Sequence, residues 1–149
     1  GYSTKSTIAS AYRSIHIEPF TNSINFTADN RRNIYLPLLE VKVRNQVVDR
    51  FMFDGNLRLT KDMSADLVLK GKVINYNRGA LRYTDSNDVE EYRVTVTVAI
   101  ELWNNNTKEI VWSEPSFSGE ATYFVTGSKA TSEDSAVDKA ILDLAKRIV

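Results

Sequence analysis

The segment from Glu91 to Trp103 constrains the fold of this chain more than any other. Apolar side chains occupy every second position, and most positions between them are polar. Because successive side chains of a strand point to opposite faces, this alternation predicts one long strand with one buried face. A strand buried on both faces would show a continuous apolar run instead. The apolar positions are Tyr92, Val94, Val96, Val98, Ile100 and Leu102.

Two other segments carry apolar residues at helical spacing. The first runs from Leu36 to Phe53, with Pro37 in its first turn and Gly55 as a natural stop. The second runs from Ser132 to Val149, after a capping-box spacing at Thr131 to Asp134. Each segment has one apolar stripe, and such a stripe must be buried against another layer.

Shorter alternating segments predict further strands around these helices. The order strand, helix, strand favours a parallel crossover in the first half, and a polar turn at 83–88 favours an antiparallel hairpin. The sequence therefore predicts an α/β (α+β) two-layer sandwich, a mixed four- to five-stranded sheet with two helices packed on one face. The expected strands are 14–20, 57–59, 65–76, 91–103 and 109–125, the last bent near Pro115, and a polar loop is expected at 21–33.

Composition limits the classes of protein to which the chain can belong. Its 149 residues suffice for about one domain, and its 19 basic and 19 acidic residues argue against a nucleic-acid binder. Cysteine is absent and His16 is the only histidine, so no thiolate or histidine metal cluster is expected. The longest apolar runs are far shorter than a membrane-spanning helix requires. We expect a flexible tether at residues 1–13 and a single domain at residues 14–149.

Motifs for catalysis are missing from the sequence. It contains no nucleophile motif and no glycine-rich phosphate loop, so an enzyme would have to work with carboxylates alone. The candidate carboxylate pairs lie in turns or at a helix start, where surface charge and capping explain them. We therefore predict no catalytic residue, no metal site and no cofactor, and interpret the chain as a binding or structural module. The pairs are Glu90 with Glu91, Asp85 with Asp88, and Glu133 with Asp134.

Five segments together resemble one known family. They are Gly1–Ser3, Ile17–Asn22, Ala65–Val73, Glu91–Tyr92 and Ile110–Trp112. Their order and spacing, over nearly the whole chain, resemble the LptE family, the outer-membrane lipoproteins of the lipopolysaccharide transport machinery.

The resemblance implies a non-catalytic protein that lies in the lumen of the LptD β-barrel, assists assembly of that barrel and binds lipopolysaccharide. In such lipoproteins a lipid-bearing cysteine directly precedes a Gly-Tyr or Gly-Trp pair. A chain that begins at Gly1 then corresponds to the mature protein without that cysteine, and the tether at 1–13 follows the lipid anchor. The implied location is the periplasmic side of the outer membrane.

The polar face of the predicted sheet is the candidate surface for contact with the barrel. A wet barrel interior is polar and suits such a face, although plain solubility explains the same residues. On this assignment Val96→Asp would be strongly destabilising, whereas Thr97→Lys on the opposite face would be nearly neutral. The partner face comprises Lys70, Lys72, Arg93, Thr95 and Thr97, with Glu101, Ser118, Glu120 and Thr122 expected beside them.

Basic residues beside turns are the candidate ligands of lipopolysaccharide, because its inner region carries clustered phosphates and charge-assisted contacts to phosphate are strong. In the LptE family a basic residue before the Glu-Tyr strand and a lysine before the final helix are associated with this role. The positions that look similar are Arg82 and Lys129. The chain departs from the family in its longer acidic hairpin tip, with Asp85, Asp88, Glu90 and Glu91, which would repel phosphate unless a divalent cation or Arg78 intervenes. Arg78 is therefore the third candidate residue for binding lipopolysaccharide.

Two other functions remain open at the level of sequence. One is a periplasmic lipoprotein domain of a different envelope assembly, such as a secretion or efflux accessory, which co-purification with a large β-barrel would distinguish. The other is a small carboxylate hydrolase, which two convergent acidic groups in a deep cleft would favour.

Overall fold

The fold was analysed in a computed structural model, which describes residues 12–24, 36 and 38–148. Most of the tether predicted at 1–13 therefore lies outside the described residues. Of its last two residues, Tyr12 accepts a hydrogen bond from Asn104 and Arg13 donates its backbone N–H to Asp66. The elements, in chain order, are β1 (Ser14–Ile17), β2 (Thr21–Asn22), α2 (Leu39–Asp54), β3 (Arg58–Leu59), β4 (Leu67–Tyr83), β5 (Val89–Asn104), β6 (Glu109–Phe124) and α3 (Glu133–Ile148).

The described strands form one six-stranded sheet in the order β3-β1-β4-β5-β6, with β2 beside β4. β1 pairs in parallel with β3 and β4, β2 pairs in parallel with β4, and β4, β5 and β6 form an antiparallel meander. The mixed sheet is confirmed, but the predicted count of four or five strands is too low. The missed strand is β2, which consists of two polar residues in the predicted 21–33 loop, most of which lies outside the described residues.

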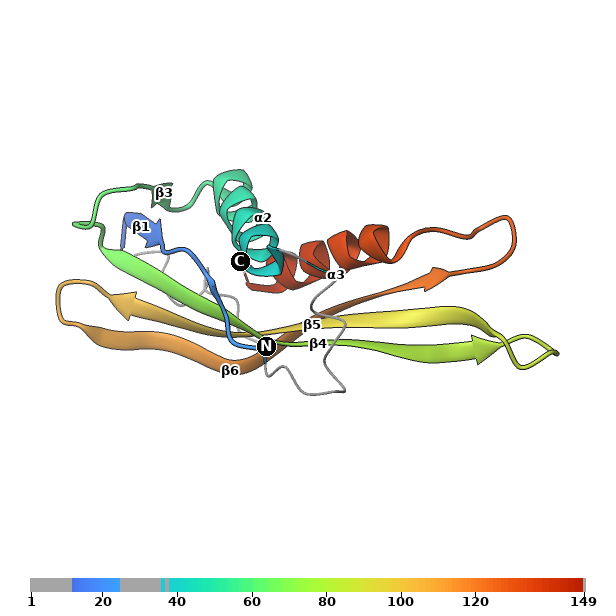
Figure 1. Cartoon of the computed structure of the whole chain (residues 1–149). Coiled ribbons are helices and arrows are strands. Elements are labelled where there is room, and N and C mark those ends of the chain that lie inside the picture. The colour runs from blue at the N-terminus through green and yellow to red at the C-terminus, as the bar shows by residue number, and fades with distance from the viewer. Residues whose placement is uncertain (1–11, 25–35, 37, 149) are drawn as a thin grey trace.

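Helices α2 and α3 cover one face of the sheet (Figure 1). No helix in the described part of the chain covers the other face, which we call the open face. The apolar stripes predicted for both helices are buried together with the apolar face of β5, which confirms the two-layer arrangement. α2 begins at Leu39 rather than Leu36, because Leu38 adopts a left-handed conformation with φ of 62°. Pro37 lies outside the described residues. In α3 the capping oxygen belongs to Ser132, which accepts a hydrogen bond from the backbone N–H of Ser135 at 3.1 Å.

A bulge in β4 changes which side chains face the helices. Val73 lies opposite Val98, but Asn75 lies opposite Thr97, so Ile74 is an extra residue in the ladder. Before the bulge the odd-numbered positions of β4 face the helices; after it the even-numbered positions do, because a bulge shifts the alternation by one residue. Tyr76 is consequently buried, with 3% of its surface exposed, and Arg78, opposite Val94, shares its face.

Thr97 corrects one detail of the predicted partner face. It lies on the open side of the sheet, but only 9% of its surface is exposed, because strands flank it on both sides. Its Oγ1 lies 2.8 Å from the Oγ of Ser118 on β6, within hydrogen-bond distance. We therefore revise the expectation for Thr97→Lys from nearly neutral to destabilising, since a lysine there would break this bond and crowd the two neighbouring strands.

Strand β6 is an edge of the described sheet, and α3 lies against it. A β-carbon added to Gly119 would overlap the carbonyl oxygen of Ala140 and lie 2.6 Å from the Cβ of Leu144. The backbone of α3 can approach β6 this closely only because residue 119 has no side chain. The backbone N–H of Glu120 donates to Asp143 Oδ2 at 3.2 Å. A side chain of α3 thus provides a hydrogen-bond acceptor for one backbone donor of this edge strand.

The lone histidine has a structural position. His16 lies on β1, and its Nδ1 is 2.9 Å from the carbonyl oxygen of Thr60, which ties β1 to the segment after β3. Among the described residues, no group of three histidine, cysteine, aspartate or glutamate side chains could hold a metal ion. No helix in the described part of the chain is both long and apolar enough to cross a membrane.

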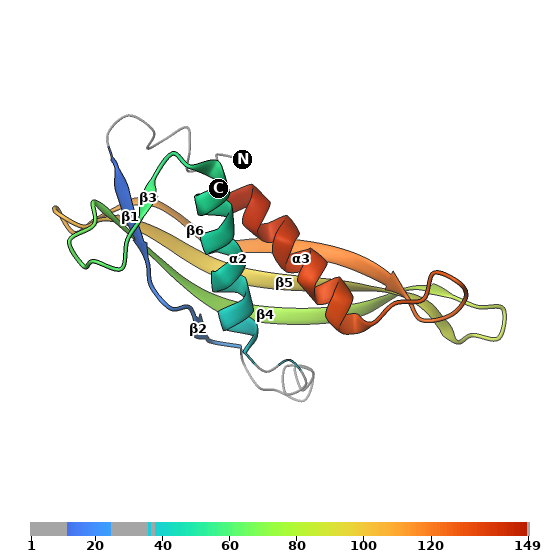
Figure 2. The same cartoon turned by 90° about the horizontal axis from the view of Figure 1, so that it is seen from above.

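The sheet is longer than the helices that cover it. At one end, the β4–β5 hairpin and the β6–α3 loop extend beyond the start of α3 (Figure 2). We call this end the hairpin arm, and define it as residues 80–92 and 123–131. The β5–β6 hairpin lies at the opposite end, beside β1 and β3.

Candidate functional site

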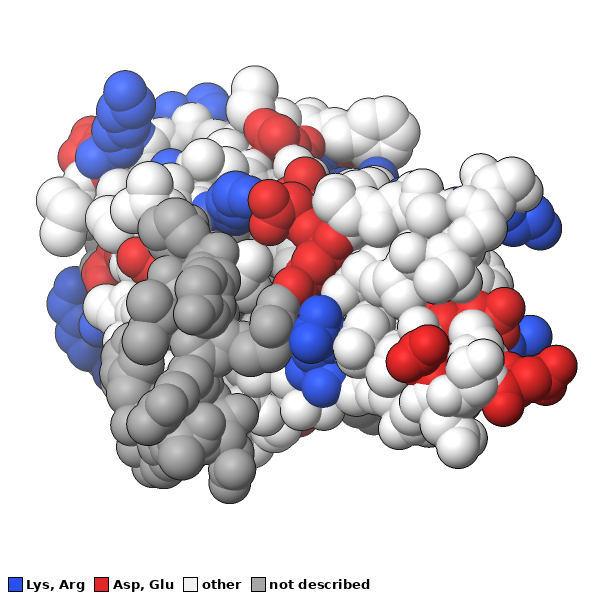
Figure 3. Space-filling model, turned by 45° about the vertical axis from the view of Figure 1, so that its right-hand side comes forward, with Lys and Arg blue, Asp and Glu red and all other residues white. Residues whose placement is uncertain are grey.

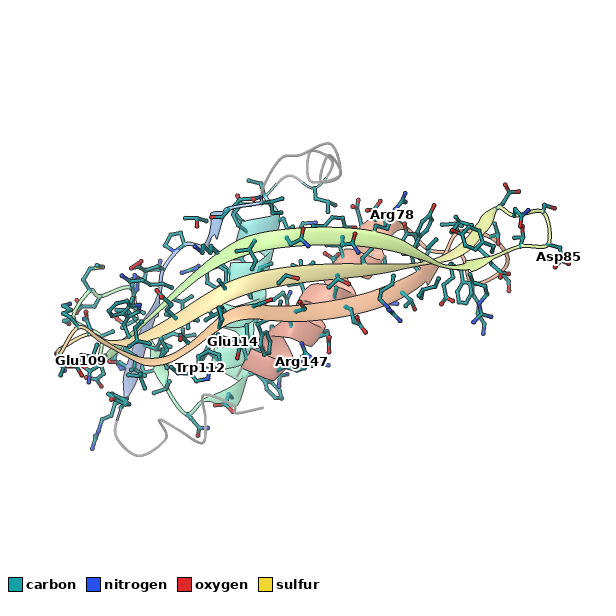
Figure 4. The ribbon with its side chains drawn as sticks, turned by 90° about the horizontal axis from the view of Figure 1, so that it is seen from below. Arg78, Asp85, Glu109, Trp112, Glu114 and Arg147 are labelled. Atoms are coloured by element: carbon teal, nitrogen blue, oxygen red, sulfur yellow. The ribbon has the colours of Figure 1, made fainter. Side chains whose placement is uncertain are left out.

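The open face of the sheet carries the predicted partner face (Figure 4). Lys70, Lys72 and Arg93 are exposed there, and Thr95 is half-buried. Lys70 Nζ lies 5.0 Å from the centre of the Trp103 ring, and Arg93 Nε lies 3.8 Å from a carboxylate oxygen of Glu120. The structure thus brings these residues onto one surface, opposite both helices.

A hollow of about 660 Å³ lies on this face, beside the connection between β1 and β2. Among the side chains on its lining are the cations Lys70 and Lys72 and the acids Glu18, Glu101 and Glu114. Glu101 already accepts a hydrogen bond from Trp103 Nε1 at 3.2 Å. Because the hollow mixes lysines with carboxylates, it suits polar contacts with another molecule better than the work of an isolated pair of acids.

The hairpin arm brings Arg82 and Lys129 to the same end of the sheet, which the sequence left open. The β6–α3 loop is tied to the hairpin by the N–H of Val125, which donates to the carbonyl of Glu90 at 3.0 Å. A bridge between Phe124 and Ala130 folds the loop back along β6. Two basic residues that are far apart in the sequence therefore lie at one end of the sheet.

Both cations of the arm are accessible. Arg82 is 63% exposed, and its Nε lies 3.4 Å from Glu91, whose side chain is only 12% exposed. Lys129 is exposed and forms no ion pair with any residue that the structure describes. Apolar side chains are also exposed on or beside the arm, namely Leu81, Tyr83 and Val125. This end of the molecule can therefore offer both charged and apolar contacts.

The arm carries four acidic residues, of which Asp85 and Asp88 lie at its tip and Glu90 and Glu91 lie on β5. Asp85 and Asp88 belong to the hairpin turn, where the N–H of Thr84 donates to the carbonyl of Asp88 at 2.7 Å. Figure 3 shows acidic side chains gathered at this end, and Figure 4 shows Asp85 at the far end of the hairpin. Arg82 precedes this turn on β4, closer to the body of the molecule.

Arg78 lies away from the tip, beneath the start of α3. Its guanidinium carbon lies 4.0 Å from the centre of the Tyr92 ring, and its Nη1 donates to the Tyr123 hydroxyl at 3.1 Å. The same Nη1 lies 3.8 Å from Glu133 Oε1, and the Tyr76 hydroxyl donates to Glu133 Oε2 at 2.6 Å. We call these five residues the tyrosine cluster.

The charge of Arg78 is stable within this cluster. Burial acts to lower the pKa of Arg78, but the hydrogen bond with Tyr123 and electrostatic effects that include the Glu133 carboxylate outweigh it. The pKa of Arg78 is therefore raised above its ordinary value, and the guanidinium stays charged at any working pH.

Sequence reasoning missed the tyrosine cluster as a unit. Its visible signal was Tyr92 and Tyr123 on the apolar sides of their strands, because a buried tyrosine hydroxyl usually needs a hydrogen-bond partner. The alternation of β4 in the sequence instead places Tyr76 on the polar side. The partner was not identifiable without the bulge at Ile74, which turns Arg78 toward the helices.

Comparison with known proteins identifies the family. Residues 12–149 match the family model for LptE, described as lipopolysaccharide-assembly. The chain belongs to the LptE family. The resemblance seen in the sequence is thereby confirmed over nearly the whole domain, whereas no curated protein sequence matches the chain significantly.

Solved structures share the fold of this LptE-family chain at low sequence identity. A hypothetical protein from Chlamydia trachomatis is 12% identical, with a TM-score of 0.59 over 93% of this chain and 94% of that one. An uncharacterized lipoprotein B from Nitrosomonas europaea is 10% identical, with a TM-score of 0.57 over 98% and 86%. A minor lipoprotein from Acinetobacter baumannii is 14% identical, with a TM-score of 0.52 over 91% and 87%.

Proposed function

We propose that this protein is a non-catalytic outer-membrane lipoprotein of the lipopolysaccharide transport system, which binds lipopolysaccharide and assists assembly and plugging of the LptD β-barrel. Membership of the LptE family supports the assignment. The observation that carries it is the hairpin arm, where Arg82 and Lys129 lie at one end of the sheet.

The arm suits an amphiphilic and anionic ligand. Lipopolysaccharide combines phosphates and acidic sugars with acyl chains, and phosphate is bound well by charge-assisted hydrogen bonds from arginine and lysine. The accessible groups of Arg82 and Lys129 supply such donors, and the exposed Leu81 and Tyr83 lie beside Arg82. The phosphates would contact the arm between the acidic tip and α3, where Arg82 is accessible and the side chain of its partner Glu91 is only 12% exposed.

The Arg82→Ala, Lys129→Glu double variant is expected to bind purified lipopolysaccharide at least about tenfold more weakly, because two charge-assisted contacts are lost. Binding should be measured by titration, with folding checked by circular dichroism. Lys146→Glu is the matched control, because Lys146 is an exposed lysine in the last turn of α3. Binding of the folded double variant at the level of this control would show that the proposed site is wrong.

We propose further that the open sheet face, with Lys70, Lys72, Arg93 and Thr95 exposed or partly exposed, contacts the LptD barrel. Its polar side chains suit a wet lumen, and the hollow beside the β1–β2 connection gives this face a shaped region that a loop of the barrel could enter.

The lipid anchor would precede residue 1 and hold the protein at the periplasmic side of the outer membrane, which palmitate labelling and fractionation of the full gene product would test.

The Lys70→Glu, Lys72→Glu double variant is expected to reduce the amount of LptD that co-purifies with the protein severalfold, because the reversal places like charges in the contact. Lys139→Glu, at an exposed position of α3, is the control. Equal recovery with both proteins would exclude this part of the face. Recovery of a different envelope complex in place of LptD would support the alternative function, a periplasmic lipoprotein domain of another assembly.

A further inference from the structure

The guanidinium of Arg78 already contacts three side chains of the protein itself. One face of the group stacks on Tyr92 at 4.0 Å, and Nη1 faces both Tyr123 and Glu133. The side chain is 24% exposed, whereas Arg82 on the same strand is 63% exposed. Each arginine faces a carboxylate, Glu133 at 3.8 Å for Arg78 and Glu91 at 3.4 Å for Arg82. The difference lies in exposure and in the further contacts of Arg78 with Tyr92 and Tyr123, which leave Arg82 the more accessible of the two to a bound phosphate.

Glu133 connects this arginine to the loop that carries Lys129. It is the first residue of α3, and it is held from two sides, by Arg78 at 3.8 Å and by the Tyr76 hydroxyl at 2.6 Å. Tyr76 and Arg78 both belong to β4, so the cluster fixes the first turn of α3 directly to the sheet.

The loop between β6 and α3 is therefore anchored at both ends. At the β6 end, the N–H of Val125 donates to the carbonyl of Glu90 at 3.0 Å. At the α3 end, the N–H of Thr131 donates back to the carbonyl of Phe124 at 3.0 Å, and Glu133 adds a side-chain anchor in the tyrosine cluster. Residues 126–130, which include Lys129, lie between these anchors. The N–H of Ala130 donates to the carbonyl of Gly127 at 3.3 Å, and Ala130 forms a bridge with Phe124.

We propose that Arg78 is a positioning residue, which fixes the first turn of α3 through Glu133 and thereby holds Lys129 where the arm binds its anionic ligand. Arg78 does not contact the ligand. This inference rests on the proposed function, and it gives Arg78 a different role from that of Arg82 and Lys129.

A positioning role and a direct contact predict opposite effects of Glu133→Gln. If Arg78 bound phosphate, removal of the carboxylate would free the guanidinium and remove one negative charge, so affinity for lipopolysaccharide would rise. If Arg78 acts through Glu133, the same change loosens the loop, and affinity falls despite the more positive charge. Arg78→Lys also separates the two roles, because lysine keeps the charge but lacks the planar group that stacks and bonds to two partners.

The experiment combines lipopolysaccharide titration with deuterium exchange of the loop amides, residues 125–131, in the absence of ligand. Arg78→Met, Arg78→Lys and Glu133→Gln are each expected to weaken binding by a factor of about three to ten and to speed exchange of the loop. The Arg78→Met, Glu133→Gln double variant should be no weaker than the worse single variant, because both changes remove the same contact. Tyr123→Phe, which removes one hydroxyl, replaces Arg78→Met if that variant does not fold.

The matched control is the ion pair between Lys42 of α2 and Asp138 of α3, which has the same 3.8 Å separation but is exposed and lies away from the arm. Lys42→Met and Asp138→Asn should change neither binding nor loop exchange. Tighter or unchanged binding by Glu133→Gln, or unaltered loop exchange in Arg78→Met, would overturn the positioning role. Unchanged binding by the Arg82→Ala, Lys129→Glu variant would instead overturn the proposed lipopolysaccharide site, and the exchange rates would still decide whether Arg78 fixes the loop.

Discussion

Val96→Asp is expected to lower the free energy of unfolding by about 3 to 5 kcal/mol, because it places an unpaired carboxylate in the core. Val96 is fully buried at the centre of β5, between Tyr76 on β4 and Gly119 on β6. None of these neighbours offers a side-chain cation to the new charge. The change should be measured by urea unfolding followed by circular dichroism.

The control for Val96→Asp is Asn77→Asp, which introduces the same side chain at an exposed position of β4. It is expected to change the free energy of unfolding by less than about 0.5 kcal/mol. Equal destabilisation by the two variants would mean that the buried and open faces of the sheet have been assigned wrongly.

Gly119→Ala is expected to destabilise the fold by about 3 kcal/mol, a large effect for the addition of one methyl group. The new Cβ would overlap the backbone of α3 at Ala140 and lie 2.7 Å from the backbone nitrogen of Leu144. Relief would require α3 to move away from β6, and that movement would open the core beneath the helix. Thermal and urea unfolding would measure the loss.

Gly79→Ala provides the matched comparison, because Gly79 also lies in a strand but a β-carbon there meets only Asn77, at 4.0 Å. This variant should be neutral or slightly more stable, since alanine reduces the freedom of the unfolded chain. If the two glycines tolerate alanine equally well, then α3 does not approach β6 as closely as described.

The parts of the fold that were predictable are those that periodicity encodes. The alternation from Glu91 to Trp103 identified β5 and its buried face. The apolar residues at helical spacing identified α2 and α3 and predicted that both helices pack on that face. Side-chain pattern cannot reveal β2, whose pairing rests on backbone bonds such as that from Ser23 to Val73 at 2.8 Å. The side-chain pattern also does not show that the neighbouring strands β4 and β6 bury Thr97, although Thr97 lies on the open face of the sheet.

The candidate site was less predictable because it depends on relations between distant segments. The sequence identified Arg82 and Lys129 as basic residues beside turns. Their location at the same end of the sheet depends on the length of the β4–β5 hairpin and on the direction of α3, which the sequence does not show. The position of Arg78 depends on one inserted residue, Ile74, in a stretch where tyrosine and arginine can be read as lying on either face.

The contact between Glu120 and Asp143 has a consequence for self-association. A free edge strand offers its backbone donors and acceptors to any passing strand, and sheet proteins that leave it bare tend to aggregate. On β6, an incoming strand would have to displace the Asp143 carboxylate from the Glu120 N–H, and at Pro115 it would find no donor at all. If the protein works beside a barrel whose own strands are still being joined, this partial protection of the β6 edge would favour contact with the barrel through side chains over pairing with its strands.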